Sequence, residues 1–396
     1  MNDTPAYTAR LTKSLDEISW EDDDFIEELR QTAQLFRPFS QAMDAFLVER
    51  GYQGDISDAG EKALFIRAAF ADAGMEAPRE VRKWFDGQPV RRETVFQICF
   101  AFGLDGDGTD DFFRRFYTRE RSFNCHLVEE AVYYFCLNNG LTWTDARDLL
   151  RDAPQPGAGD GEVVYTGSII AALNGLSTKE EMAAWLRANI GKFVGSNVTA
   201  CESIRRLWGI VAGPDGLLLR EREALPSLLN DAATGRKSAL RAGQEGLKPW
   251  DACLAIFQLD KGSVKRLETD RSLKPMLAHL HDAARDSFPD RQGIDKILRG
   301  DKVSYERVRK WLVLLTFYAF WARRAVERGS YAADPGDAAR CMAETDRFLV
   351  DAGYPELYVG NPYDWIFFYA ARDEEPLFLF RYIFNELLAG TLEAHP

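Results

Sequence analysis

The stretch that decides the fold runs from Glu61 to Phe116 and reads EKALFIRAAFADAGMEAPREVRKWFDGQPVRRETVFQICFAFGLDGDGTDDFFRRF. Its apolar residues recur at helical spacing, and glycine or proline residues divide them into short segments. We expect helices over Glu61–Asp72, Arg79–Asp86, Arg91–Phe102 and Asp107–Phe116. The pattern therefore predicts a compact unit made only of helices.

Two residues define the connection between the first two of these helices. Gly74 supplies the positive φ that ends a helix without steric cost. Pro78 stands in the first turn of the next helix, where the N–H that proline lacks would have no helical partner. Helical spacing turns Val81, Trp84 and Phe85 inward and leaves cations on the opposite face. A helix, a tight turn and a second, basic helix together predict a helix-turn-helix (HTH).

The residues after this turn also carry a resemblance to a known family. Val81–Thr94 (VRKWFDGQPVRRET) and Gln97–Leu104 (QICFAFGL) resemble the second half of the lambda-repressor-like (XRE) HTH family. In that family a recognition helix ends at a glycine, and a loop with a proline leads to a helix that ends in an apolar run before Gly-Leu. The resemblance implies that Pro78–Phe85 is the recognition helix. The whole chain is also similar to bacterial proteins that contain an HTH.

The resemblance implies that the partner is double-stranded DNA and that the protein is a bacterial transcriptional regulator. Such binding requires cations, because neutralising phosphates supplies most non-specific affinity for DNA. The candidate DNA-binding residues are Arg79, Arg82, Lys83, Arg91, Arg92, Arg114 and Arg115. The first three would face the DNA from the recognition helix, and the others would hold phosphates. The alternative is a helical interaction or scaffold protein, in which the HTH is structural and the cations form a solvated face.

Composition limits the class of protein. A chain of 396 residues corresponds to about two or three domains, and 46% hydrophobic residues suffice for sizeable cores. The net charge of −13 argues against a protein that coats nucleic acid with its whole surface, but it permits one basic face. The six cysteines form no CxxC pair, which suits the reducing cytoplasm. No signal peptide is evident, and the longest apolar run, Trp311–Ala322, is too short to cross a membrane. We therefore expect a cytoplasmic protein.

One stretch has the composition of a linker. Asp152–Gly161 reads DAPQPGAGDG and predicts a domain boundary. We expect an N-terminal helical domain over residues 1–151, with the HTH at about 61–116, and a larger helical domain over residues 162–396. Within the second domain, Thr178 and Glu181 have the spacing of a capping box and predict a helix over Lys179–Ile190.

The second domain contains a segment similar to the first. Ile294–Glu306 can be laid on Val81–Glu93 at an offset of 213, with lysine, glycine, valine and glutamate in common. The coincidence has two explanations: a second HTH-like unit at about 264–322, or chance among helices of similar chemistry. A true repeat would resemble a dimer within one chain, since HTH proteins commonly present two recognition helices to two half-sites. Its DNA face would consist of Lys296, Arg299, Lys302 and Arg307.

Two other segments have alternative interpretations. Cys125, His126, Glu129 and Glu130 are the types of residue that bind metal or form a nucleophile with a base. Cys125 and His126 are adjacent, however, and point about 100° apart on a helix. We therefore predict no catalytic residue, no metal site and no cofactor, and lean against an enzyme. Asn361–Leu388 is rich in aromatic residues, which fits either a core or an interface with a second copy or a protein partner.

Overall fold

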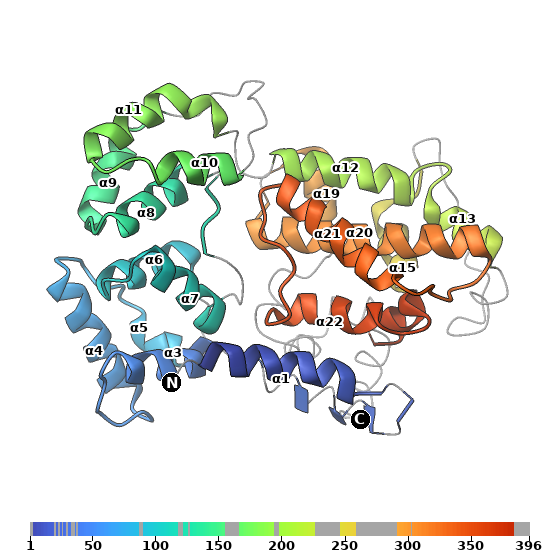
Figure 1. Cartoon of the computed structure of the whole chain (residues 1–396), viewed down its shortest axis with the longest axis horizontal. Helices are drawn as coiled ribbons and strands as arrows, with labels where there is room; N and C mark the ends of the chain where they lie inside the picture. The colour runs from blue at the N-terminus through green and yellow to red at the C-terminus, as the bar shows by residue number, and fades with distance from the viewer. Residues whose placement is uncertain are drawn as a thin grey trace. The chain divides into compact units, whose positions relative to one another are not determined.

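The computed structural model of the chain describes residues 3–19, 21–22, 24–25, 27–28, 31–32, 36, 39–86, 90–117, 122–125, 127–154, 166–193, 198–225, 246–258, 291–301 and 303–383. The regular elements among these residues are α-helices and one short 3-10 helix, which confirms the all-α fold class (Figure 1). Within the same residues, none of the helices combines the length and the apolar character needed to cross a membrane.

The chain folds into two compact units. Unit 1 consists of Met1–Phe36 and Thr199–Pro396, and unit 2 consists of Arg37–Val198. This division differs from the expected one at residues 152–161. Unit 2 is a continuous segment inserted into unit 1, so the two ends of the chain belong to the same unit.

Unit 2 is built from a succession of helices. They are α3 (Phe39–Glu49), α4 (Ala59–Asp72), α5 (Val81–Trp84), α6 (Arg92–Ala101), α7 (Gly106–Phe116), α8 (Val128–Asn138), α9 (Trp143–Asp152), α10 (Thr166–Leu173) and α11 (Lys179–Asn189), followed by the 3-10 helix η1 (Ile190–Lys192). Aromatic side chains fill the centre: the ring of Phe46 meets those of Phe102, Phe112 and Phe116 edge-on or nearly so. These rings join α3, α6 and α7 into one core.

Helices α10 and α11 belong to this core and not to a second domain. Leu173, Met182 and Leu186 are buried in the same apolar cluster as α8 and α9. The Lys179 ammonium also donates to the Asp145 carboxylate at 2.6 Å, which links α11 to α9. The proline- and glycine-rich stretch is therefore a connection within unit 2; its residues 155–161 lie outside the described residues.

The capping box at the start of α11 is confirmed. The Thr178 hydroxyl accepts from the backbone N–H of Glu181, and the Glu181 carboxylate accepts from the N–H of Thr178. Each side chain satisfies an N–H that the first helical turn leaves without a partner.

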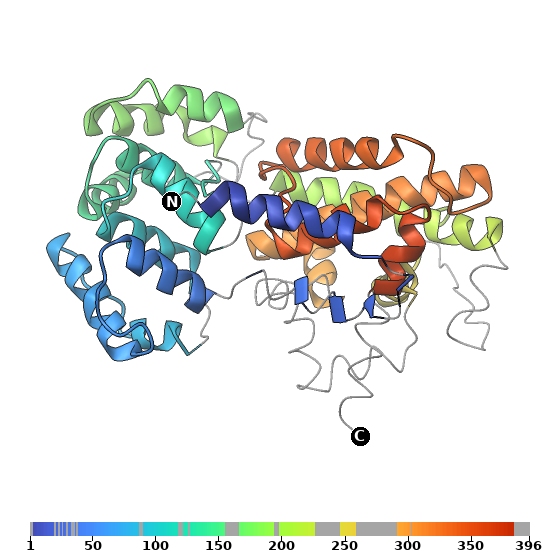
Figure 2. The ribbon, with the colours of Figure 1, turned by 60° about the horizontal axis from the view of Figure 1, so that its bottom comes forward.

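Unit 1 surrounds one central helix. Its helices are α1 (Asp3–Glu17), α12 (Val198–Ala212), α13 (Leu217–Ala224), α15 (Pro249–Phe257), α19 (Arg291–Arg299), α20 (Tyr305–Arg328), α21 (Asp337–Asp351) and α22 (Pro362–Ala371), with a further helical stretch over residues 376–383. Residues 308–322 of α20 are buried without a break. Helix α21 lies along α20 (Figures 1 and 2). The apolar run Trp311–Ala322 is therefore a core helix, covered on all sides.

The aromatic C-terminal region supplies much of this core. In its described part, Trp365 and Phe367 are buried, and the indole N–H of Trp365 donates to the carbonyl oxygen of Leu11 at 3.3 Å. The phenol of Tyr369 donates to the carbonyl oxygen of Ile18 at 3.1 Å. The aromatic residues of α22 thus hold the N-terminal segment within unit 1.

A buried polar network joins α20 to α13 and to residue Arg381. Arg381 donates to both carboxylate oxygens of Glu221, at 2.6 and 3.1 Å. The phenols of Tyr318 and Tyr331 donate to the same carboxylate, at 2.5 and 2.7 Å. Burial raises the pKa of Glu221, but the charge and hydrogen bonds of Arg381 outweigh it, so that the carboxyl's pKa lies below its ordinary value. One cation and one anion balance each other in the network, which joins α13, α20 and the C-terminal helical stretch.

Candidate nucleic-acid interface

The expected recognition helix is shorter than the sequence indicates. Helix α5 is a single turn, Val81–Trp84, so that Pro78 and Arg79 precede it and Phe85 is its C-terminal cap. Val81 and Trp84 anchor it in the core, but the capping position, Glu80, makes no side-chain cap. The packing of these two side chains therefore holds the turn, because a helix this short has little stability of its own. The prediction of a helix over Pro78–Phe85 is corrected accordingly.

The connection between α4 and α5 is also longer than expected. Gly74 has a φ of +68°, as predicted for the end of α4. Residues 73–80 then separate the two helices. A typical HTH turn has about 3–4 residues. The connection consequently adds no support to the family resemblance.

The three cations expected on α5 all lie at the surface. Arg79, Arg82 and Lys83 are exposed. The Lys83 ammonium is 3.0 Å from the Glu80 carboxylate, and both side chains are more than half exposed (53% and 62%). Such a surface pair contributes about 0–1 kcal/mol, so Lys83 can exchange this carboxylate for another anion.

A fourth cation, which the sequence analysis missed, joins these three. The Arg67 guanidinium of α4 donates to the backbone carbonyl of Arg79 at 3.5 Å, and Arg67 is itself exposed. We call Arg67, Arg79, Arg82 and Lys83 the basic ridge. Arg67 is the one cation within the apolar run Ala63–Phe70 of α4, and only that position could have indicated it.

The charges around the basic ridge are mixed. Four exposed carboxylates stand in the same segment, at Asp72, Glu76, Glu80 and Asp86. The net field of the segment is therefore weak at a distance. Attraction for an anion must come from direct contact with the guanidinium and ammonium groups, which salt screens less than it screens distant charges.

Arg92 is separated from this surface by its own contacts. Its guanidinium donates to the two carboxylate oxygens of Glu130, at 2.6 and 2.9 Å, and also to the carbonyl oxygen of Ser122. It stacks over the ring of Phe113, 4.9 Å from the centroid. Only 14% of the side chain is exposed. Arg92 joins α6 to α8, and we remove it from the residues expected to hold phosphates.

The two arginines of α7 are likewise engaged. Arg115 bonds to Glu49 and, at 3.0 Å, to Asp111. Arg114 lies 3.2 Å from Asp110. Arg115, with 14% of its side chain exposed, is removed from the expected set for the same reason as Arg92. Arg91, at the N-cap of α6, is exposed and remains a candidate.

The cations expected on the second face are divided in the same way. Lys296 and Arg299 are exposed on α19, and Arg307 is half-buried on α20. Lys302 lies outside the described residues. The structure places one further exposed cation at α19: Arg205 of α12, whose Nε donates to the carbonyl oxygen of Ile297 at 3.1 Å.

The cysteine considered as a nucleophile is deep in the core of unit 2. Cys125 has no exposed surface, and burial raises the pKa of its thiol, with the nearby Glu130 adding to the effect. The Glu130 carboxylate already accepts from Arg92 and from the N–H of Asn124 at 2.7 Å. Glu129 is exposed, and His126 lies outside the described residues. A buried, protonated thiol is neither a good nucleophile nor a good metal ligand.

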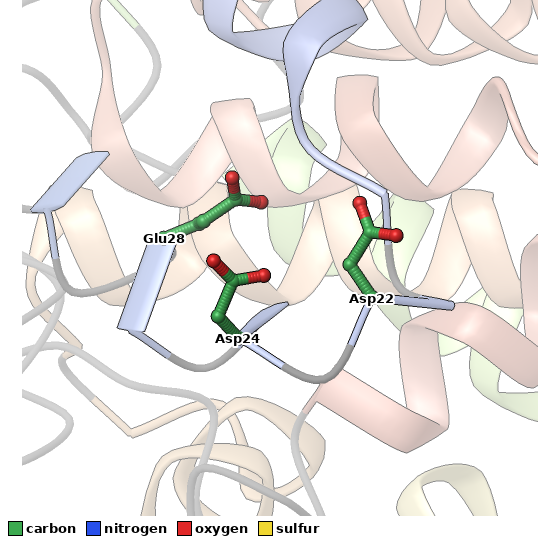
Figure 3. Close-up of side chains that lie close together, drawn as sticks. All are labelled: Asp22, Asp24 and Glu28. Carbon is green, nitrogen blue, oxygen red and sulfur yellow. The ribbon is translucent and has the colours of Figure 1, made fainter.

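One acidic cluster has donor atoms of the kind that bind hard cations. Oxygens of Asp22, Asp24 and Glu28 lie within 4.8 Å of one another (Figure 3). Burial, and then repulsion by Asp24 and Asp22, raises the pKa of the Glu28 carboxyl. With one oxygen from each residue, the three carboxylates supply half or fewer of the roughly 6–8 oxygens that surround Ca²⁺. The cluster by itself assigns no metal.

Comparison with models of protein families, with curated proteins and with solved structures gives no match.

Proposed function

We propose that this protein is a DNA-binding regulator of bacterial type and that the basic ridge of unit 2 is its contact surface for duplex DNA. One observation carries the proposal. The hydrogen bond from Arg67 of α4 to the backbone of Arg79, two residues before α5, brings cations of the two helices together at the surface. Arg92, in contrast, is paired with the buried carboxylate of Glu130.

The core of unit 2 holds the part of the basic ridge that lies on α5. Val81 and Trp84 are buried beneath α5, while Arg82 and Lys83 lie on its exposed side. The side chains on the outer face therefore project from a turn whose inner face is held by the core. Arg91, at the start of α6, adds an exposed cation after α5.

The shortness of α5 determines the kind of binding that we expect. A single turn presents few side chains to base edges, which are the groups that carry sequence information. Contacts with phosphates then supply most of the affinity and make it strongly dependent on salt. We infer modest sequence discrimination in unit 2 alone.

The test is selection from a pool of random duplex DNA at physiological salt, with sequencing of the retained fraction. Arg79→Ala/Arg82→Ala removes two cations of the ridge. Arg147→Ala/Arg187→Ala removes two exposed cations of α9 and α11 and is the matched control. The proposal requires an enriched motif that the first variant loses and the control keeps. Absence of enrichment, or equal losses in the two variants, would refute it.

A cytoplasmic site of action fits the thiols. Cys99, Cys125, Cys136, Cys253 and Cys341 are buried as free cysteines. Burial raises the pKa of Cys99 and of Cys136 to about 12, so these thiols stay protonated. They behave as small apolar residues and need no oxidising compartment.

A role in protein interaction is the second candidate, and one residue favours it. Leu64 of α4 is 64% exposed and stands one turn before Arg67, on the same side of the helix. An apolar side chain beside cations also suits a protein partner. Leu64→Ser removes no charge. If the surface binds DNA through phosphates, this variant should keep the wild-type dependence on salt, whereas loss of a co-purifying protein in this variant alone would favour the second candidate.

A further inference from the structure

We infer that unit 1 carries a second surface for the DNA backbone, formed by Arg205, Lys296 and Arg299, so that one chain holds duplex DNA at two places. This inference rests on the proposed function, because it extends DNA binding from one unit to the other. We call these three residues the second basic ridge.

The first support is a repeated pair of helices. The pairs are α5 with α6 in unit 2 and α19 with α20 in unit 1. The second helix of each pair begins at an equivalent position, Arg92 for α6 and Tyr305 for α20, which preserves the offset of 213 found in the sequence. The residues before them, Arg91 and Ser304, have nearly the same backbone angles: φ −71° and ψ 145° in one, φ −66° and ψ 150° in the other. Extended angles are usual at an N-cap, so the preserved offset, and not the angles, supports a repeat.

The first helices of the two pairs agree in burial. Val81 and Trp84 of α5 correspond to Ile294 and Ile297 of α19, and all four are buried. Lys83 and its counterpart Lys296 are both exposed. Chance similarity between two sequences does not require the same positions to face the core, so the agreement favours a structural repeat.

Each pair also acquires an arginine from another helix. In unit 2, Arg67 of α4 donates to the backbone carbonyl of Arg79, next to α5. In unit 1, Arg205 of α12 donates to the backbone carbonyl of Ile297 in α19. In both units a guanidinium from another helix is held near exposed cations, those of α5 in unit 2 and those of α19 in unit 1.

The backbone at the end of α19 makes room for this arginine. Gly300 has a φ of +83°, in the left-handed region that favours glycine. A Cβ atom at this position would stand 3.3 Å from Nη2 of Arg205. Glycine therefore ends the helix and leaves room for the guanidinium beside it.

The cations of the second basic ridge are available to an anion. Arg299 is 3.4 Å from the Asp301 carboxylate, with 68% and 53% of the two side chains exposed. A pair this exposed is weak and exchanges readily for phosphate. Cations near the end of a helix also stabilise its C-terminal carbonyls, so the test must separate stability from binding.

Two surfaces in one chain change the expected affinity. A duplex bound by both ridges would gain affinity beyond that of either ridge alone, because the second contact is then intramolecular. HTH proteins usually achieve this by forming a dimer. The two ridges would give a single chain the same advantage.

The experiment measures the affinity of the full chain for a 40-bp duplex of mixed sequence over a range of salt concentrations. The variants are Lys296→Ala/Arg299→Ala in the second basic ridge, Arg79→Ala/Arg82→Ala in the basic ridge, and their combination. The control, Arg220→Ala/Arg323→Ala, removes two exposed cations of α13 and α20 in unit 1. Thermal denaturation of each variant reports stability separately. A 40-nucleotide RNA hairpin is the comparison ligand.

The inference requires each ridge variant to lower the slope of log Kd against log salt by about 2, since each lost phosphate contact lowers it by about 1. The combined variant should lose about twice as much as either, and the control should match wild type. A normal slope in Lys296→Ala/Arg299→Ala, with a reduced slope in Arg79→Ala/Arg82→Ala, would overturn this inference and leave the proposed function standing. Equal effects in the control, or tighter binding to the RNA, would also overturn it. Wild-type protein without affinity for the duplex would refute both proposals.

Discussion

The guanidinium of Arg92 and the carboxylate of Glu130 form a two-point ion pair inside unit 2, with N–O distances of 2.6 and 2.9 Å. The pair joins the start of α6 to the first turn of α8. The preceding residue, Arg91, is exposed to solvent. Two adjacent arginines therefore have opposite roles: one stabilises the fold, and the other is available to a ligand.

We expect Arg92→Ala to destabilise the protein strongly. The substitution leaves Glu130, which is 5% exposed, as a buried charge with only the N–H of Asn124 as a partner among the contacts described above. Removing one member of a buried pair costs about 3–5 kcal/mol. Urea denaturation, followed by helical circular dichroism, measures the change.

Arg91→Ala is the control for this variant, because an exposed side chain outside any network changes stability by about 0.5 kcal/mol or less. If the two variants were equally stable, Arg92 would not hold α6 to α8. It would then return to the set of candidate phosphate contacts.

The arginine pair also shows how far the sequence can predict the candidate site. Composition and spacing identify a basic segment, and the exposed Arg82 and Lys83 follow from the helical period. They cannot distinguish Arg91 from Arg92, because the carboxylate that engages Arg92 lies far along the chain on α8. Arg67 was missed for the same physical reason, since its contact with Arg79 depends on how α4 and α5 pack.

We expect a fragment of residues 37–198 to fold on its own and a fragment of residues 1–151 to fold poorly. The fragment of residues 1–151 lacks α10 and α11, whose Leu173, Met182 and Leu186 are buried in the same cluster as α8 and α9. It also retains α1, whose contacts lie in unit 1. Thermal denaturation of the two fragments tests this. Equal, cooperative transitions would contradict the division into units.

This difference shows why helices were easier to predict than domains. Caps and apolar spacing are local, so α4, α6, α7 and α11 were expected within one or two residues of their observed bounds. A domain boundary depends instead on which apolar faces meet. The composition of residues 152–161 indicates a flexible connection, but it does not indicate whether the helices on either side share a core.

The stability of unit 1 should fall in acid partly because of Asp337. Burial raises the pKa of this carboxyl, but hydrogen bonds from the Asp334 N–H, Arg328 and Arg340 outweigh it and lower the pKa to about 2. The unfolded chain has an Asp pKa of about 3.9, so between these values the unfolded state binds more protons. The contribution is complete above about pH 4 and is lost as pH falls toward 2, amounting to about 2.5 kcal/mol.

Asp337→Asn should therefore lower stability at pH 7 and flatten its dependence on pH between about 4 and 2. Asp351→Asn, an exposed position at the other end of α21, should leave that dependence as in wild type. Denaturation midpoints over the pH range provide the measurement. If the stability of Asp337→Asn still fell steeply between pH 4 and 2, other carboxylates would be responsible for the acid dependence.

In the network at Glu221, we expect loss of the charged carboxylate to cost more stability than loss of a tyrosine hydroxyl. Glu221→Gln leaves Arg381, which is 3% exposed, as a buried cation without its counter-charge, and we expect a loss of about 3–5 kcal/mol. Tyr331→Phe removes the hydrogen bond to the carboxylate, at 2.7 Å, and the one that the hydroxyl accepts from Arg381, at 3.2 Å, while both charges stay paired. Its cost should be smaller, about 1.5–3 kcal/mol, as for other hydrogen bonds to a charged group. Denaturation of the two variants in urea measures both values.

Equal costs would mean that the tyrosine stabilises the network as much as the ion pair does. Arg381 would then be stabilised sufficiently by the carbonyl oxygens of Ala255 and Ile256, at the end of α15.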